Sequence, residues 1–148
     1  MKLFRFASLV YSVVCFLGIG VASAQPYTSE SKDGGVITVI SLKRSGSDSV
    51  ILKGSIENTG ANTLKISDLT DSRSAFSAVL QDPVAKKEYQ QIRVDGNRVG
   101  STHGLNSVPS HGKINFWARI TAPPPEVEKV TVVFAGSALP IEDVPLQK

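Results

Sequence analysis

Residues 112–134 read GKINFWARITAPPPEVEKVTVVF and predict two β-strands joined by a segment with three successive prolines. In the first strand the side chains alternate, with Ile114, Phe116, Ala118 and Ile120 on one face and Lys113, Asn115, Trp117 and Arg119 on the other. A period of two is typical of a strand with one buried face. The second strand places Val130, Val132 and Phe134 on one face. Because prolines cannot donate ladder hydrogen bonds, Pro123, Pro124 and Pro125 end the first strand and hold an extended connection.

Strand character extends outward from this stretch in both directions. The further strands are predicted at residues 36–42, 49–58, 63–66, 75–81 and 86–94, with a short edge segment at 141–146. The residues expected to share an inward face are Val36, Thr38, Ile40 and Leu42 in the first, Val50, Leu52, Gly54 and Ile56 in the second, and Phe76, Ala78 and Leu80 in the fourth. Turn-forming residues at 45–48 predict a hairpin between the first two strands, and those at 95–97 predict a tight turn.

These short strands, separated by frequent turns and with no amphipathic helix between them, predict an all-β fold. The expected architecture is an immunoglobulin-like antiparallel β-sandwich of about seven strands. Residues 99–113 are irregular, and Leu105 and Val108 are expected to plug an edge of the sandwich. No Cys…Trp…Cys frame is present, so the antibody type of domain is excluded.

The N-terminus is typical of a cleaved signal peptide, assigned to residues 1–24. Lys2 and Arg5 precede a largely apolar run, and Ala22-Ser23-Ala24 gives the small-x-small pattern that a signal peptidase recognises. Cleavage leaves Gln25 as the new terminus. The alternatives are a retained membrane anchor, for which the run is short, and a lipoprotein at Cys15, whose preceding residues lack the small side chain of a lipobox.

Removing residues 1–24 leaves 124 of the 148 residues and lowers the formal net charge from +3 to +1. Residues 25–35 are expected to form a flexible leader, and residues 36–148 a single domain. No basic stripe remains for nucleic-acid binding. The chain's one cysteine is removed with the signal peptide, so disulfides, thiol catalysis and thiolate metal sites are excluded in the mature chain.

Several of these segments together resemble a group of bacterial exported immunoglobulin-like domains of unknown function. The resembling residues are 41–44 and 50–60, the Phe116-Trp117-Ala118-Arg119 strand, Ala122-Pro123-Pro124, and residues 127–132 and 140–145. The resemblance covers nearly the whole mature chain, and Trp117 to Pro125 is its most specific part. It implies the fold but no agreed activity. Many members of the group carry a Cys-x-Cys in the turn that reads Asp95-Gly96-Asn97-Arg98 here, so a redox role of that turn is not expected.

Trp117 and Arg119 are the candidate partner-binding residues. Alternation places both opposite the apolar face of their strand, and an exposed Trp–Arg pair is a composition typical of interface hot spots. The structural alternative is a strand buried on both faces, or a Trp117 side chain packed under the proline segment. The Pro-Pro-Pro segment offers a polyproline surface or simply a stiff loop.

Catalytic and metal-binding patterns are weak in this sequence. His103 and His111, with Asp95 or Asn106, form one conceivable metal site, although neither histidine has the fixed spacing of a strand or helix. Two pairs of carboxylates, Asp68 with Asp71 and Glu126 with Glu128, are weak candidates for glycosidic chemistry. No nucleophile-elbow or Ser-x-x-Lys motif is present. We therefore expect no enzyme activity, no catalytic residue, no bound cofactor and no metal.

The resulting expectation is an exported, non-catalytic binding or accessory module of the bacterial cell envelope, periplasmic or secreted. It would contact an envelope protein or another envelope component through a sheet face or a loop end. It would bind no nucleic acid and, after cleavage, would not be an integral membrane protein. The alternative is a metal-binding or enzymatic protein that uses the His103–His111 loop, and a third option is self-association through an exposed edge strand.

Overall fold

The computed structural model describes residues 27–30, 34–65, 76–101, 107–135 and 139–148. These residues form no helix and twelve β-strands: Tyr27–Glu30 (β1), Gly35–Ser45 (β2), Ser49–Asn58 (β3), Leu64–Lys65 (β4), Ala78–Gln81 (β5), Glu88–Gln90 (β6), Arg93–Val94 (β7), Asn97–Arg98 (β8), Ser107–Val108 (β9), Lys113–Thr121 (β10), Lys129–Phe134 (β11) and Ile141–Pro145 (β12). The predicted all-β class is confirmed. The expected signal peptide at 1–24, residues 67–74 between the predicted strands 63–66 and 75–81, and Leu105 lie outside the described residues.

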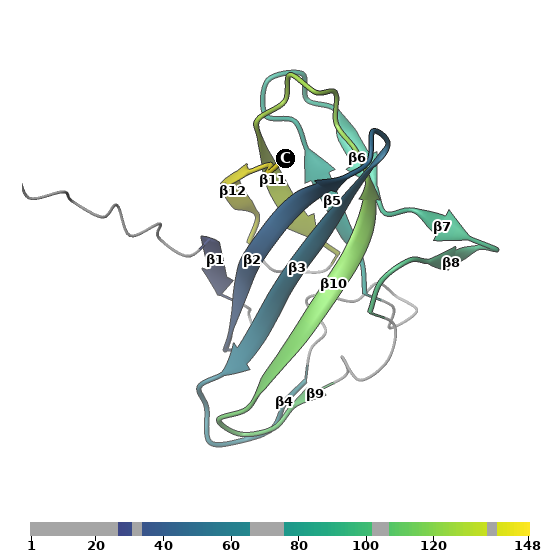
Figure 1. Ribbon diagram of the computed structural model, residues 1–148. Coiled ribbons are helices and arrows are strands. Elements are labelled where there is room, and N and C mark those ends of the chain that lie inside the picture. The colour runs from purple at the N-terminus through teal and green to yellow at the C-terminus, as the bar shows by residue number, and fades with distance from the viewer. Residues whose placement is uncertain (1–26, 31–33, 66–75, 102–106, 136–138) are drawn as a thin grey trace, which may run out of the picture.

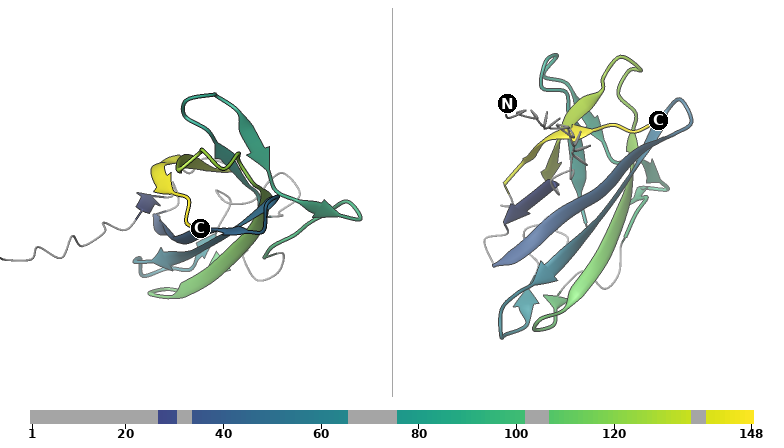
Figure 2. Two further views of the ribbon diagram at one scale, coloured as in Figure 1. Left: turned by 45° about the horizontal axis from the view of Figure 1, so that its top comes forward. Right: turned by 60° about the vertical axis from the view of Figure 1, so that its left-hand side comes forward.

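The strands build two four-stranded sheets and two short pairs. The first sheet has the order β1-β2-β3-β10, the second has the order β12-β11-β5-β6, and the pairs are β4-β9 and β7-β8. All pairings between these strands are antiparallel. The two four-stranded sheets form separate layers in Figures 1 and 2, an arrangement consistent with a β-sandwich. Nothing in the described part of the chain forms an apolar helix of membrane-spanning length.

The first sheet is built around β3, which pairs with β2 on one side and with β10 on the other. The bounds of β3 are those predicted, and its four inward residues, Val50, Leu52, Gly54 and Ile56, are buried as expected. The β2–β3 hairpin is confirmed, with a turn at residues 46–48. Gly46 has a φ of 76° in this turn, a conformation that side chains with a Cβ rarely adopt.

The predicted inward face of β2 is wrong over most of its length. Ile37 and Val39 are buried, whereas Val36 and Thr38 are only half-buried and Ile40 is 59% exposed. The ladder to β3 shifts register between Val39 and Ser41, which returns Leu42 to the buried face. This β-bulge inserts one residue and changes which face later side chains occupy. Residues 36–40 are apolar or β-branched throughout, so alternation alone did not distinguish their two faces.

The expected irregular leader is partly a strand. Tyr27–Glu30 forms β1 and pairs with β2 from Tyr27↔Val39 to Glu30↔Val36. The Ser29 hydroxyl donates to the carbonyl oxygen of Leu139, at 2.8 Å, in the segment that leads into β12 of the second sheet. β1 has only four residues and no apolar alternation, so its strand conformation depends on pairing with β2 and not on its own sequence.

The two strands of residues 112–134 have the predicted faces but belong to different sheets. Phe116, Ala118 and Ile120 of β10 are buried, as are Val130, Val132 and Phe134 of β11. β10 pairs with β3 in the first sheet and β11 pairs with β5 and β12 in the second. The proline segment is therefore a crossover between sheets rather than a hairpin turn (Figure 1). Arg44 fixes this crossover by donating to the carbonyl oxygens of Pro123 (2.7 Å), Pro124 (2.8 Å) and Val127 (3.2 Å).

Three phenylalanines, from β10, from β11 and from the segment just before β5, occupy the core between the sheets. The rings of Phe76 and Phe116 lie 5.0 Å apart, those of Phe116 and Phe134 lie 5.7 Å apart edge to face, and those of Phe76 and Phe134 lie 6.1 Å apart. Gly54 makes room for this cluster, because a Cβ at that position would overlap the Phe116 ring and the carbonyl oxygen of Thr38. The predicted inward face of Phe76, Ala78 and Leu80 is confirmed, as is the burial of Val108.

The predicted strand at 86–94 is divided into two elements that serve different sheets. β6 pairs with β5, after which Gln91 bridges to Ile120 and the Ile92 N–H donates to the Arg119 carbonyl oxygen at 2.9 Å. The chain then forms the β7–β8 hairpin, which projects from the body in Figures 1 and 2. The predicted tight turn at 95–97 is confirmed. Asp95 and Gly96 have φ values of 50° and 78°, as a type I′ hairpin turn requires.

Candidate functional site

Trp117 and Arg119 lie on the outer side of β10, facing away from the core. Trp117 is 42% exposed, Arg119 is half-buried, and their neighbours Lys113 and Asn115 are exposed. A strand buried on both faces is therefore not what the structure shows. Both candidate residues are held by regular backbone pairing on a nine-residue strand, which gives them a more defined position than a loop would.

Strand register surrounds these two residues with side chains from β2 and β3. Trp117 lies opposite Lys53, and Lys53 lies opposite Ser41; Arg119 lies opposite Ile51, which lies opposite Lys43. The bulge places the exposed Ile40 between the Val39 and Ser41 pairings. We call this surface the Trp117 face, defined by Ile40, Lys43, Ile51, Lys53, Trp117 and Arg119. Figure 1 shows β2, β3 and β10 side by side in this layer.

The Trp117 face is positively charged and contains no carboxylate. Its three cations are Lys43, Lys53 and Arg119, in two adjacent cross-strand rows. The acidic residues of this side of the sheet, Glu30 and Glu57, are both in register with Val36 at the other end of β2. Glu57 is also paired there with Lys113, with 3.8 Å between Nζ and Oε2. Among the described residues of these two rows, the face thus combines an exposed indole with three cations and no carboxylate.

Hydrogen bonds hold the two candidate residues in place from both sides. Arg119 Nε donates to the hydroxyl of Ser49 at 3.0 Å, and that hydroxyl donates to the Ser45 carbonyl oxygen at 2.7 Å. On the outer edge of β10, the Trp117 N–H donates to Ser101 Oγ at 3.0 Å, and the Ser101 N–H donates back to the Trp117 carbonyl oxygen at 2.8 Å. This edge of β10 is therefore covered by residues of the same chain, which disfavours strand addition at Trp117.

The described part of the proposed metal site does not come together. Asp95 is in the turn of the projecting β7–β8 hairpin, whereas His111 is an exposed residue in the β9–β10 turn, and these two elements lie apart in Figure 1. His103 and Asn106 lie outside the described residues, as do Asp68 and Asp71. Among the residues that the structure describes, no group of three or more His, Cys, Asp and Glu is placed to hold a metal ion. Glu126 and Glu128 are both exposed.

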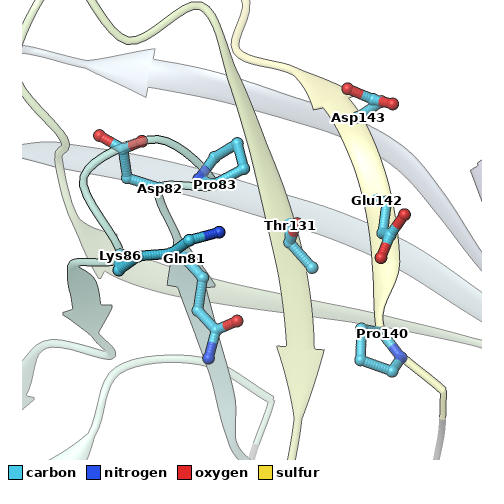
Figure 3. A pocket seen from close by; sticks show the side chains of 8 residues that line it. All are labelled: Gln81, Asp82, Pro83, Lys86, Thr131, Pro140, Glu142 and Asp143. Atoms are coloured by element: carbon cyan, nitrogen blue, oxygen red, sulfur yellow. The ribbon is translucent and has the colours of Figure 1, made fainter.

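A shallow hollow of about 430 Å³ lies on the second sheet, lined by Gln81, Asp82, Pro83, Lys86, Thr131, Pro140, Glu142 and Asp143 (Figure 3). Two of the three acidic residues that line it, Asp82 and Asp143, already have structural partners. Asp82 Oδ1 accepts from the N–H groups of Val84 (2.8 Å) and Ala85 (3.0 Å), and Asp143 pairs with Lys129 at 4.0 Å. Burial raises the pKa of the nearby Tyr89 phenol, and the carboxylates of Asp82 and Glu126 raise it further, so this phenol is neutral at neutral pH.

Sequence reasoning identified two of the six residues of the Trp117 face and missed the other four. Lys53 and Ile51 were predicted to point outward from β3, but nothing local shows that they lie beside Trp117 and Arg119. Only the register between β3 and β10, which pairs Trp117 with Lys53 and Arg119 with Ile51, places them there. Ile40 was expected to face inward, and Lys43 joined the face through the same bulge that exposes Ile40.

Comparison with known proteins gives no relative: no family model, no curated protein and no solved structure matches this chain.

Proposed function

We propose that this chain is an exported, non-catalytic binding module of the bacterial cell envelope with an immunoglobulin-like fold. Its Trp117 face would bind an acidic surface of an envelope protein or of another envelope component. The observation that carries the proposal is the exposed indole of Trp117 among three cations, on a strand whose position is fixed by pairing on both sides. Trp and Arg are the residues most enriched in binding hot spots.

The strand order supports the immunoglobulin-like assignment. Leaving out β1, the main strands form one sheet of β2-β3-β10 and an opposing sheet of β12-β11-β5-β6. The chain changes sheet between β3 and β5, between β6 and β10, and again between β10 and β11. Antiparallel sheets connected by such crossings are the pattern of immunoglobulin-like sandwiches. The short strands β1, β4 and β7–β9 account for the difference between the twelve observed strands and the seven expected.

The charge of the face defines the chemistry of the partner. Lys43, Lys53 and Arg119 have no carboxylate within their two rows, so an acidic partner surface would supply the missing countercharge. The indole and the exposed Ile40 supply apolar area between these charges. An interface of this composition should weaken as ionic strength rises, because salt screens exposed charges over about 8–10 Å.

Export is tested by the N-terminus of the chain recovered from the envelope of an expressing bacterium. We expect the mass of residues 25–148, with Gln25 first, because Ala22-Ser23-Ala24 precedes the cleavage point. An Ala24→Arg variant should block cleavage and keep the uncleaved mass. Recovery of the full-length chain from the wild type, in the membrane fraction, would contradict cleavage and support a retained anchor.

Binding is tested with the mature chain immobilised and exposed to envelope extract. The wild type should capture a specific partner, and Trp117→Ala should weaken the complex about 30-fold or more, as removal of a hot-spot side chain worth about 2 kcal/mol does. The separate variant Lys53→Glu should also weaken the complex, most strongly at low salt, because it reverses a charge beside Trp117. Captured proteins are identified by mass spectrometry and their affinities measured with the purified partner.

The matched control is Val84→Ala, which removes an apolar side chain that is 89% exposed in the loop between β5 and β6 of the other sheet. Val84→Ala should bind as the wild type does, and all variants should have equal melting temperatures. A partner retained equally by Trp117→Ala and Lys53→Glu would place the interface elsewhere. A folded wild type that captures nothing specific would argue against the binding function itself.

A further inference from the structure

The Trp117 face presents two large apolar side chains to solvent. Ile40 of β2 is 59% exposed and Trp117 of β10 is 42% exposed. Of the five large apolar side chains that are exposed in the described part of the chain, only these two belong to the same sheet. They flank Lys53 of β3, which pairs with Trp117 on one side and with Ser41, the neighbour of Ile40, on the other. Apolar side chains gathered on one exposed face mark an interaction surface.

Basic side chains are interspersed with these apolar ones. Lys53 lies in the row of Trp117, and Lys43 and Arg119 lie at the two ends of the next row. Both lysines are exposed, and neither forms an ion pair within the described part of the chain. A lysine can lay its apolar stem along a surface while its ammonium group stays in a polar layer. The face therefore carries apolar groups and cations together, the two features by which proteins bind the surface of an anionic membrane.

The Trp117 face is an open sheet surface and not a cleft. It is formed by β2, β3 and β10, the three longest of the described strands, which lie side by side in Figure 1. The hollow of Figure 3 takes no lining residue from this face, and neither does a second hollow at the base of the β7–β8 hairpin.

This openness favours a lipid surface over a folded protein as the partner. The aromatic hot spots of protein interfaces are buried in well-packed pockets, whereas a layer of lipid headgroups adapts to an exposed surface and needs no matching shape. The two lysines carry point charges on flexible stems, in contrast to the rigid fork with which an arginine recognises one carboxylate. Such charges suit a layer of many mobile phosphates.

We propose that the Trp117 face docks on the anionic phospholipid surface of a membrane. This inference rests on the proposed function and names the envelope component that the face contacts. The indole of Trp117 lies at the level of the headgroups, where tryptophan is enriched because its ring is apolar and its N–H is polar. Ile40 enters the same layer, and Lys43 and Lys53 contact the phosphates. Docking depends on anionic lipid, because each Lys or Arg near such a surface adds to the affinity.

Trp117 reports on its own contact with lipid, because it is the chain's single tryptophan. The test mixes the mature chain, recovered from the envelope of an expressing bacterium, with vesicles of equal parts phosphatidylglycerol and phosphatidylcholine. The chain should sediment with these vesicles, and its emission should shift to shorter wavelength. Lipids brominated on their acyl chains should quench the emission, since bromine quenches an indole only at close range. Vesicles of phosphatidylcholine alone should bind about tenfold more weakly or less, because they lack the attraction to the cations.

Charge variants test the orientation of the chain on the vesicle. Lys43→Gln and Lys53→Gln should each lower the partition coefficient about fivefold, the usual contribution of one cation near an anionic lipid surface. Lys86→Gln is the matched control, because it removes the same charge from the exposed turn between β5 and β6 of the second sheet. That variant should bind nearly as the wild type does.

Apolar variants test the depth of docking. Trp117→Ala should lower the partition coefficient about tenfold, through loss of the apolar area that the indole buries in the lipid. Val84→Ala, which truncates an exposed apolar side chain of the second sheet, should leave it unchanged. All variants are compared at equal melting temperature, and quenching of the wild type decides the orientation without any substitution.

Three results would overturn the inference. Vesicle binding without quenching of Trp117, or with equal losses in Lys53→Gln and Lys86→Gln, would place the lipid contact on another surface. Equal binding to vesicles of phosphatidylcholine alone would remove the role of the cations. Absence of vesicle binding, together with capture from envelope extract of a protein that Trp117→Ala loses, would assign the face to a protein and leave the proposed function standing. Failure of both vesicles and extract to bind would reject the inference and the proposed function together.

Discussion

Phe116→Ala should lower the free energy of unfolding by about 3–5 kcal/mol, the range observed when buried phenylalanines are truncated. Phe116 is in the middle of the aromatic cluster, with ring centroids 5.0 Å from Phe76 and 5.7 Å from Phe134. Its ring also lies against the backbone at Gly54, so a cavity there is bordered by strand backbone that cannot collapse into it. Against a typical total stability of about 5–15 kcal/mol, the loss is large enough to be seen in any denaturation curve.

Urea unfolding followed by the fluorescence of Trp117, the chain's single tryptophan, measures this loss directly. Phe116→Leu retains most of the buried volume and should lose clearly less. Asn115→Ala, at the exposed neighbouring position, should stay within about 0.5 kcal/mol of the wild type. A loss below about 1 kcal/mol for Phe116→Ala would show that the two sheets do not pack through this cluster.

Arg44→Met should cost about 2–3 kcal/mol, since it removes charged hydrogen bonds to three carbonyl groups of the crossover between β10 and β11. Arg44 comes from β2, so its guanidinium ties the first sheet to the segment that leads into the second. Methionine keeps much of the apolar stem, and the loss therefore reports on the guanidinium rather than on packing. Thermal unfolding by circular dichroism, with Tm and enthalpy fitted together, gives the value.

Lys43→Met is the matched control because Lys43 is the exposed neighbour on the outer face of the same strand. That variant should change stability by less than about 0.5 kcal/mol. Arg44→Lys should fall between the wild type and Arg44→Met, because a single ammonium group lacks the planar fork that reaches several carbonyl oxygens at once. Equal Tm values for Arg44→Met and Lys43→Met would show that the guanidinium contacts do not stabilise the crossover.

The strands that were predicted best are those with one apolar and one polar face. β3 has its predicted bounds, and β10 and β11 have their predicted inward residues. In each of them the alternation of side chains is a local property, since successive residues of any strand point to opposite sides. β2 lacks that contrast, because residues 36–40 are apolar or β-branched on both faces, and its bulge reverses the alternation before Leu42.

The candidate surface was predictable only in part, for a related reason. The outward direction of Trp117 follows from the alternation of β10. Its neighbours Lys53 and Lys43 are more than 60 residues away in the chain, and they come beside Trp117 and Arg119 only through the register of β2, β3 and β10. The β7–β8 hairpin follows the same rule, because its tight turn at 95–97 was evident in the sequence, whereas the pairing of the preceding Gln91 with Ile120 of β10 was not.

The sequence by itself determined that this chain forms an all-β fold, which apolar side chains of β3, β10 and β11 face the core, and where the hairpin turns lie. The tertiary structure decided that β10 and β11 belong to different sheets, that Tyr27–Glu30 adds a strand, that Arg44 holds the crossover, and which cations surround Trp117. The division has one physical cause. The faces to which the side chains of a strand point, and the geometry of a tight turn, depend on adjacent residues. Strand pairing and register are instead settled by contacts between residues that are distant in the chain.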